Sequence, residues 1–141
     1  MEPLNLDGLP DQALLLIDSA PIIYTLEGRA GLADRFQPLF AAHAEERLCF
    51  AVTTITLAEV MAGPLQAGDE ELAQRYRAVL QSWQVIDLDV QVAETAARLR
   101  ASLKLKLPDA VQAASAVSIN ADALVTHDRD FSRLTSIRVI S

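Results

Sequence analysis

The sequence predicts a single α/β domain in which helices cover a mainly parallel sheet. Short, continuous apolar runs alternate along the chain with longer segments of helical periodicity, and such runs are typical of strands buried on both faces. The length of 141 residues suits one domain. A composition of 51% hydrophobic and 22% charged residues is that of a globular protein and excludes intrinsic disorder.

The first part of the chain predicts a lead segment, a strand and a helix. Residues 1–13 contain two prolines and a glycine and are expected to form an N-terminal extension, followed by one domain over residues 14–141. The apolar run Ala13–Ile17 predicts the first strand. Pro21 suits the first turn of the next helix, and Gly28 suits its end.

The middle of the chain continues the alternation. Apolar residues at helical spacing predict a helix over Leu32–Glu46, and Leu48–Val52 predicts a second buried strand. The helix expected over Thr56–Ala62 should break at the following Gly63-Pro64 pair. An amphipathic pattern with acidic residues at its start predicts a further helix over Asp69–Trp83.

The last part predicts three strands and two helices. Gln84–Asp87 is a short third strand, and Asp89 could cap a helix from Val90 to about Leu105. Pro108 begins another helix, whose small residues would pack closely on a sheet. The last two expected strands are Ala123–Thr126 and Ile137–Ile140.

Composition excludes several classes of protein. The single cysteine, Cys49, excludes an internal disulfide and a cysteine-based zinc site, and its place among apolar strand residues predicts a core position. The apolar runs are too short to cross a bilayer, so no membrane association is expected. The first residues carry acids but no Lys or Arg, so we expect no secretory signal and a cytoplasmic location.

The charge is unevenly distributed along the chain. Residues 1–97 hold 5 basic and 15 acidic residues, a net of −10, whereas residues 98–141 hold 7 and 4, a net of +3. An acidic total of −7 therefore does not exclude a local basic surface that attracts nucleic-acid phosphates. The candidates for such contacts, each of which could also be an ordinary solvated charge, are Arg98, Arg100, Lys104, Lys106 and Arg129.

Four acidic residues fall where a parallel sheet collects functional groups, beyond the carboxyl ends of its strands or within apolar helical segments. They are Asp18, Glu59, Asp109 and Asp128. Each also has a local structural explanation. Asp18 could cap the next helix, and Thr56 with Glu59 matches a capping box. Asp109 suits the first turn of a helix, and Asp128 with Asp130 suits a turn or a helix cap.

Together the four carboxylates predict a site for a hard divalent cation, Mg²⁺ or Mn²⁺, because they would otherwise repel one another. Such a site can activate water and neutralise charge on a phosphodiester. We expect Asp18 and Asp109 to be direct ligands, with Glu59 and Asp128 completing the site directly or through water.

Four segments carry a resemblance to a known family. They are LLIDSAPIIY around Asp18, TTITLAEV around Glu59, KLPDAVQAA around Asp109 and ADALVTHDRDF around Asp128. In this order they resemble the PIN domain, and most closely the VapC-type toxins of toxin–antitoxin pairs. The resemblance runs from about Leu14 to Ile140.

The resemblance implies a three-layer α/β/α fold with a five-stranded sheet in the order 3-2-1-4-5. It implies an endoribonuclease that depends on one or two Mg²⁺ or Mn²⁺ ions held by the four acids named above. It places the fourth acid at Asp128 rather than Asp130, which suits the N-cap of a short helix. The accessory candidates are Asp130, Ser19 and Thr126.

The same resemblance implies partners. A VapC-type toxin would form a homodimer and be silenced by a cognate antitoxin lying in a groove near the site. The residues expected to line that groove, unless they belong to the core, are Ile22, Ile23, Tyr24 and Leu26, with the apolar residues of the 56–62 helix. The alternative function is an inactive module of the same fold that binds a protein or RNA.

Other chemistries fit the sequence less well. His43 and His127 could form an acid–base pair for a metal-free ribonuclease, but we expect a surface residue and a loop residue. Ser19 lacks the G-x-S-x-G pattern of a serine nucleophile, and there is no glycine-rich phosphate-binding loop.

Overall fold

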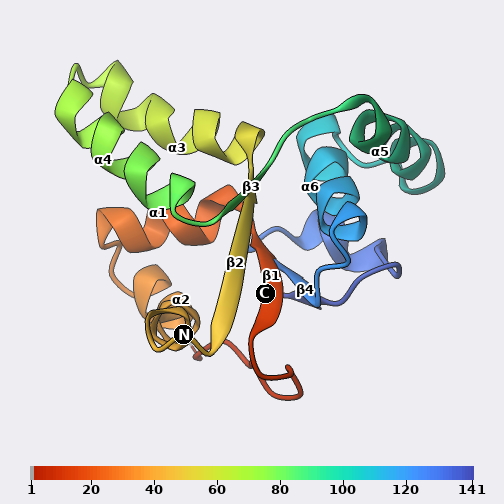
Figure 1. Cartoon of the computed structure of the whole chain (residues 1–141), viewed down its shortest axis with the longest axis horizontal. Coiled ribbons are helices and arrows are strands. Elements are labelled where there is room, and N and C mark those ends of the chain that lie inside the picture. Colours follow the sequence, from red (N-terminus) through yellow and green to blue (C-terminus); the bar gives the residue numbers. More distant parts are fainter. Residues whose placement is uncertain (1) are drawn as a thin grey trace.

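The structure is a computed structural model that describes residues 2–141. It contains one sheet of five strands in the order β3-β2-β1-β4-β5 (Figure 1). The strands are β1 (Ala13–Ile17), β2 (Leu48–Thr53), β3 (Gln84–Ile86), β4 (Ala123–Val125) and β5 (Val139–Ile140). Each paired strand runs parallel to its neighbour. The expected fold class and strand order are therefore confirmed, and the strand ends differ from the expected ones by at most two residues.

Helices cover both faces of this sheet and give the expected three layers (Figure 1). One face carries α1 (Ser19–Glu27), α2 (Leu32–Ala44), α3 (Thr54–Gln66) and α4 (Glu70–Gln81). The other face carries α5 (Val90–Leu103), α6 (Leu107–Ser118) and the 3₁₀ helix η1 (Arg129–Arg133). None of the helices within residues 2–141 is both long and apolar enough to cross a bilayer.

The core occupies both faces of the sheet because the central strand is apolar along its whole length. Leu15 and Ile17 pack with Phe36 of α2 on one face. Leu16 points the opposite way and packs with Ala113 of α6. These side chains are fully buried, which is why the strand reads as a continuous apolar run rather than as an alternating one.

Helix α3 differs from the expectation at both ends. It begins at Thr54, with Thr53 as its N-cap accepting a hydrogen bond from the backbone N–H of Thr56 at 3.1 Å. The predicted break at Gly63-Pro64 is wrong, since the helix runs on to Gln66. The residue before the proline is a glycine, and its lack of a Cβ removes part of the clash that normally ends a helix there.

Other helix ends follow the predicted signals. Gly28 ends α1 with a φ of 63°, which glycine adopts without strain. Asp69 and Asp89 cap α4 and α5, each accepting a backbone N–H three residues on. Helices α2 and α5 are shorter than expected, because Glu46 and Lys104 adopt positive φ values just beyond them.

The residues before β1 pack on the domain that follows them. Leu4 is 5% exposed within the core, and its N–H donates to the carbonyl of Arg35 at 3.0 Å. The Arg35 side chain donates in turn to the backbone carbonyls of Glu2 and Ser141. Arg138 donates to the carbonyl of Asp7 at 2.9 Å. The N-terminal segment is thus held by α2 and by the chain around β5.

Candidate active site

The candidate site lies at the point where the order of the strands in the sheet reverses direction. Strands β2 and β3 extend from one side of β1, and β4 and β5 extend from the other. Ligands of open α/β sheets bind beyond the carboxyl ends of the strands at such a point. Asp18 directly follows β1, and Thr126 directly follows β4. The Thr126 hydroxyl donates to Oδ2 of Asp18 at 2.8 Å, so the two strand ends are joined at this point.

Asp18 is held by three donors. Its Oδ1 accepts from the backbone N–H of Ser19 at 2.8 Å and from Nε2 of Gln112 at 2.9 Å, and Thr126 supplies the third bond. Asp18 is thereby also the N-cap of α1. Oδ2 keeps one lone pair that accepts no hydrogen bond from residues 2–141. Asp18 can therefore cap α1 and still bind a ligand.

Glu59 faces Asp18 from α3. Its Oε2 accepts from the Ser19 hydroxyl at 3.4 Å. The capping box of Thr56 with Glu59 is wrong, because Thr53 is the N-cap and Thr56 already lies inside the helix. Partial burial raises the pKa of Glu59, and the charge of Asp18 raises it further, whereas the Ser19 bond acts in the opposite direction.

Asp109 lies in the first turn of α6. Partial burial and the charges of Asp128, Asp18 and Asp130 raise the pKa of Asp109 from 3.8 to about 6, and Lys106 opposes them. A carboxyl crowded in this way by other acids is destabilised in its charged form, and a bound cation relieves that cost.

Asp128, rather than Asp130, caps the 3₁₀ helix η1. Asp128 is the N-cap of η1, and its Oδ1 accepts from the backbone N–H of Asp130 at 2.8 Å. The expectation that Asp130 is the N-cap is therefore wrong. The backbone N–H of Asp128 donates to the Thr126 hydroxyl at 3.0 Å. Asp109, Asp128 and Asp130 each offer an oxygen within 4.8 Å of the others.

The four expected acids line one cavity of about 580 Å³. Ser19, Tyr24, His127 and Arg129 also line it. Asp130 instead lines a smaller neighbouring hollow with Lys104, Lys106 and Arg133. Carboxylates from four separate elements line this cavity, and carboxylate oxygens are the donors that Mg²⁺ and Mn²⁺ prefer, so the residues present fit a hard divalent ion.

The basic candidates separate into two groups. Arg129 lines the acidic cavity, and Lys106 is close enough to Asp109 to affect its pKa, while Lys104 lines the neighbouring hollow. Arg98 is exposed and pairs with Glu94 at 3.0 Å. Arg100 donates to the carbonyl of Leu105 at 3.4 Å. The structure therefore brings the first three to the acids and leaves Arg98 and Arg100 in local contacts of α5.

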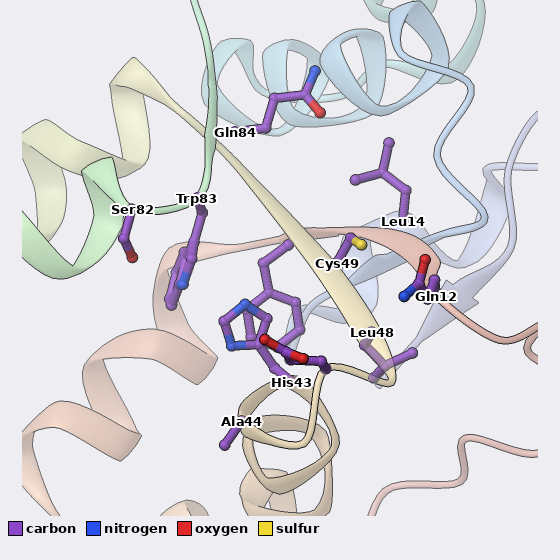
Figure 2. A pocket seen from close by; sticks show the side chains of 11 residues that line it. Gln12, Leu14, His43, Ala44, Leu48, Cys49, Ser82, Trp83 and Gln84 are labelled. Atoms are coloured by element: carbon purple, nitrogen blue, oxygen red, sulfur yellow. The ribbon is translucent and has the colours of Figure 1, made fainter.

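A larger hollow, of about 750 Å³, lies at the opposite end of the strands, near the start of β2 (Figure 2). Its lining contains one acid, Glu46, and within residues 2–141 its side chains form no group of three close metal-ligating residues. Cys49 is exposed there, and its predicted core position is wrong, because β3 pairs with β2 only from Ala51 onward. His43 is half-buried and stacked on Phe50 at 4.1 Å rather than fully at the surface, and burial lowers its pKa.

His127 and the residues expected to line a groove lie in different surroundings. His127 is half-buried, with its ring edge-to-face with Tyr24 and with Phe36, each at 5.7 Å. Of the expected groove residues, Ile22 is 1% exposed and belongs to the core. Ile23, Tyr24 and Leu26 are partly buried against that core.

Gln112 contacts Asp18 directly and is not among the site residues predicted from the sequence. The signal was present, because Gln112 is the one large polar side chain in the run Ala110–Ala114. A polar residue among small apolar ones on a buried helix normally has a partner, and here the partner is a candidate metal ligand.

The structure is thus a parallel α/β sandwich in which four carboxylates line one cavity at the carboxyl ends of the strands. The chain belongs to the PIN domain family, whose model matches residues 15–136. A comparison with curated protein sequences found no significant match.

Comparison with solved structures supports membership of this family. A toxin–antitoxin complex from Klebsiella pneumoniae contains a chain 30% identical to this one, with a TM-score of 0.73, over 90% of this chain and 96% of that one. VapBC2 from Rickettsia felis, bound to a DNA fragment from its promoter, is similar at 20% identity, with a TM-score of 0.70 over 89% and 96%. The VapC20 toxin of Mycobacterium tuberculosis, which cleaves the sarcin–ricin loop, is similar at 16% identity, with a TM-score of 0.64 over 90% and 99%. The last two likenesses concern the fold.

Proposed function

We propose that the protein is a Mg²⁺- or Mn²⁺-dependent endoribonuclease that serves as the toxin of a type II toxin–antitoxin pair. The observation that carries this proposal is the convergence of Asp18, Glu59, Asp109 and Asp128 on one cavity. Membership of the PIN domain family and the likeness to the Klebsiella toxin–antitoxin complex support it.

The acids hold the ions in this proposal. Asp18 and Asp109 would bind one or two divalent ions directly, and Glu59 and Asp128 would complete the site directly or through water. When bound, such an ion supplies an activated water and neutralises charge that develops on the scissile phosphate. The site residues are not interchangeable, because Asp18 is held by three donors whereas Glu59 is held by one long bond.

The chain's own groups also prepare the site for a polyanion. Four carboxylates would repel RNA in the absence of a cation, since phosphate contacts need positive charge. Arg129 at the cavity and Lys106 beside Asp109 are placed to attract phosphates toward it.

RNA cleavage with and without a chelator tests the enzyme proposal. We expect the purified protein to cleave RNA with Mn²⁺ or Mg²⁺, to stop in EDTA and to recover when Mn²⁺ is added back. Asp18→Asn is the matched inactive variant, since asparagine keeps the shape of the side chain but not its charge. RNA that stays intact under all metal conditions, while the protein still binds it, would favour the alternative of an inactive binding module.

The proposed partners are a cognate antitoxin and a second copy of the chain, in the cytoplasm where the RNA substrate is found. An acidic cavity favours an inhibitor that inserts Arg or Lys. Ile23, Tyr24 and Leu26 are partly buried against the core, and Tyr24 also lines this cavity, so these residues form the proposed edge of the groove. Co-expression with the product of the adjacent gene, followed by size-exclusion chromatography with light scattering, tests both partners. Two separate peaks, with toxicity unrelieved, would contradict the antitoxin proposal.

A further inference from the structure

Gln112 is an unusual residue for its position on α6. It is 2% exposed and follows Asp109 by three residues on the helix that covers the sheet. Its neighbours Ala110, Val111 and Ala113 are all buried apolar residues. Placing a primary amide in such surroundings is costly unless each of its polar atoms finds a partner.

Every polar group of this amide is used. Nε2 donates one hydrogen to Oδ1 of Asp18 at 2.9 Å and the other to the Thr56 hydroxyl at 2.7 Å. Oε1 accepts from the Thr53 hydroxyl at 2.7 Å. The opposite orientation of the amide would set its oxygen against the carboxylate of Asp18, so the network fixes which end faces the acid.

These hydrogen bonds form a chain in which each group donates to the next. The backbone N–H of Thr56 donates to the Thr53 hydroxyl, which donates to Gln112, which donates to Asp18. The chain therefore runs from the N-terminal end of α3 to the carboxylate. Aligned bonds of this kind polarise one another in a buried setting and strengthen the last donor. Thr53 and Thr56 are buried as well, at 1% and 0% exposure.

We propose that Gln112 is a positioning residue for the metal site, acting through Asp18. With the Ser19 N–H it occupies Oδ1 of Asp18, which leaves Oδ2 as the oxygen with room for a cation. Because Gln112 and Asp109 share the first turns of α6, the bond also fixes Asp18 relative to Asp109. This inference rests on the proposed function, since it assigns the residue a role toward the same ions.

The test is Mn²⁺ binding, measured by the loss of the free-ion signal in electron paramagnetic resonance. Gln112→Met keeps the length of the side chain and removes its donors. We expect its dissociation constant for Mn²⁺ to rise about 10- to 100-fold, the usual effect of removing a partner of a metal ligand. The Mn²⁺ concentration for half-maximal RNA cleavage should rise in parallel, while KM for RNA at saturating Mn²⁺ stays unchanged.

Ser115→Ala is the matched control. Ser115 lies on the same helix, is fully buried, and its hydroxyl has no hydrogen-bond partner within residues 2–141. The control changes buried packing without touching the network, so it should bind Mn²⁺ like the wild type. Equal Mn²⁺ affinity of Gln112→Met and the wild type would overturn the inference and leave the proposed function standing, whereas a wild type that binds no Mn²⁺ would overturn both.

A second measurement uses the unsubstituted chain, in case Gln112→Met does not fold. In a ¹⁵N spectrum of the full chain, the side-chain amide signals of Gln112 should shift as Mg²⁺ is added, together with the backbone signal of Ser19. Side-chain signals that stay in place while the backbone signal of Ser19 moves would contradict the proposed contact between Gln112 and the ion-binding carboxylate.

Discussion

The hydroxyl of Thr126 lies between two of the site's acids and bonds to both residues. It donates to Oδ2 of Asp18 at 2.8 Å and accepts from the backbone N–H of Asp128 at 3.0 Å. Thr126 is fully buried, whereas Asp18 is half-buried and Asp128 exposed, so both bonds are partly shielded from water. One hydroxyl at the end of β4 therefore sets the position of an acid from β1 and of the acid that begins η1.

Replacing Thr126 tests this relationship. Thr126→Val keeps the shape of the side chain and removes the hydroxyl, so Asp18 loses a donor and the backbone of Asp128 loses an acceptor. We expect Mn²⁺-dependent RNA cleavage to fall about 10- to 100-fold, and stability to fall by about 1 kcal/mol. Thr126→Ser is the control and should keep most of the activity. Equal activity of the valine and serine variants would contradict a role for the hydroxyl.

Asp128 and Asp130 are separated by a pair of substitutions. Asp128 lines the cavity with Asp18 and Glu59, whereas Asp130 lines the neighbouring hollow. Asp128→Asn should lower metal-dependent cleavage by orders of magnitude with stability unchanged or slightly raised, because asparagine still caps η1 and the repulsion falls. Asp130→Asn should change cleavage much less. If Asp130→Asn abolishes cleavage and Asp128→Asn does not, Asp130 is the fourth acid.

The raised pKa of Asp109 predicts a pH-dependent stability in metal-free protein. The folded state binds this proton more tightly than the unfolded state, so the free energy of unfolding decreases as pH rises from about 4 to about 6. Asp109→Asn removes the charged form. It should stabilise the metal-free protein at pH 7 by about 1 kcal/mol, because water screens a partly exposed carboxyl, and should have little effect below about pH 4.

Thermal unfolding of the wild type and Asp109→Asn in EDTA at several pH values measures this effect. The difference in melting temperature should be about 3 °C at pH 7 and should disappear in acid. A variant that melts below the wild type at pH 7, with the difference disappearing in acid, would mean that folding stabilises the carboxylate, contrary to the crowding seen around it.

The strands, and the positions of Asp18 and Asp128 beyond them, could be predicted because local pattern determines where the buried strands end. A strand buried on both faces, such as Ala13–Ile17, needs apolar residues at every position, and the residue that follows it must lie at the edge of the sheet. Asp18 is therefore placed by the chain itself. Parallel pairing then brings the end of β4 beside the end of β1, which carries Asp128 to the same edge.

The features that could not be predicted depend on tertiary contacts. Gln112 is satisfied by groups from β1, β2 and α3 that only folding brings together. Cys49 is exposed because β3 begins opposite Ala51, and no local signal marks where a neighbouring strand starts. Thr53 rather than Thr56 caps α3, since both residues are threonines and the choice depends on where β2 stops.

The N-terminal segment offers a test of packing apart from the site. Leu4 is 5% exposed in the core, so Leu4→Ala should destabilise the fold by about 2–3 kcal/mol. Leu65, on α3, is 44% exposed, and Leu65→Ala should cost less than about 1 kcal/mol. Urea unfolding of both variants measures the contrast. Equal midpoints would show that residues 2–9 do not belong to the cooperative unit.

In the proposed function, Asp18, Glu59, Asp109 and Asp128 together form one divalent-metal site. Diffraction from crystals soaked in Mn²⁺, collected where manganese scatters anomalously, tests it most directly. We expect an anomalous peak in the cavity, within direct coordination distance of oxygens of Asp18 and Asp109, that is lost in Asp18→Asn. A cavity without a peak at saturating Mn²⁺, or a peak that persists in Asp18→Asn, would contradict it.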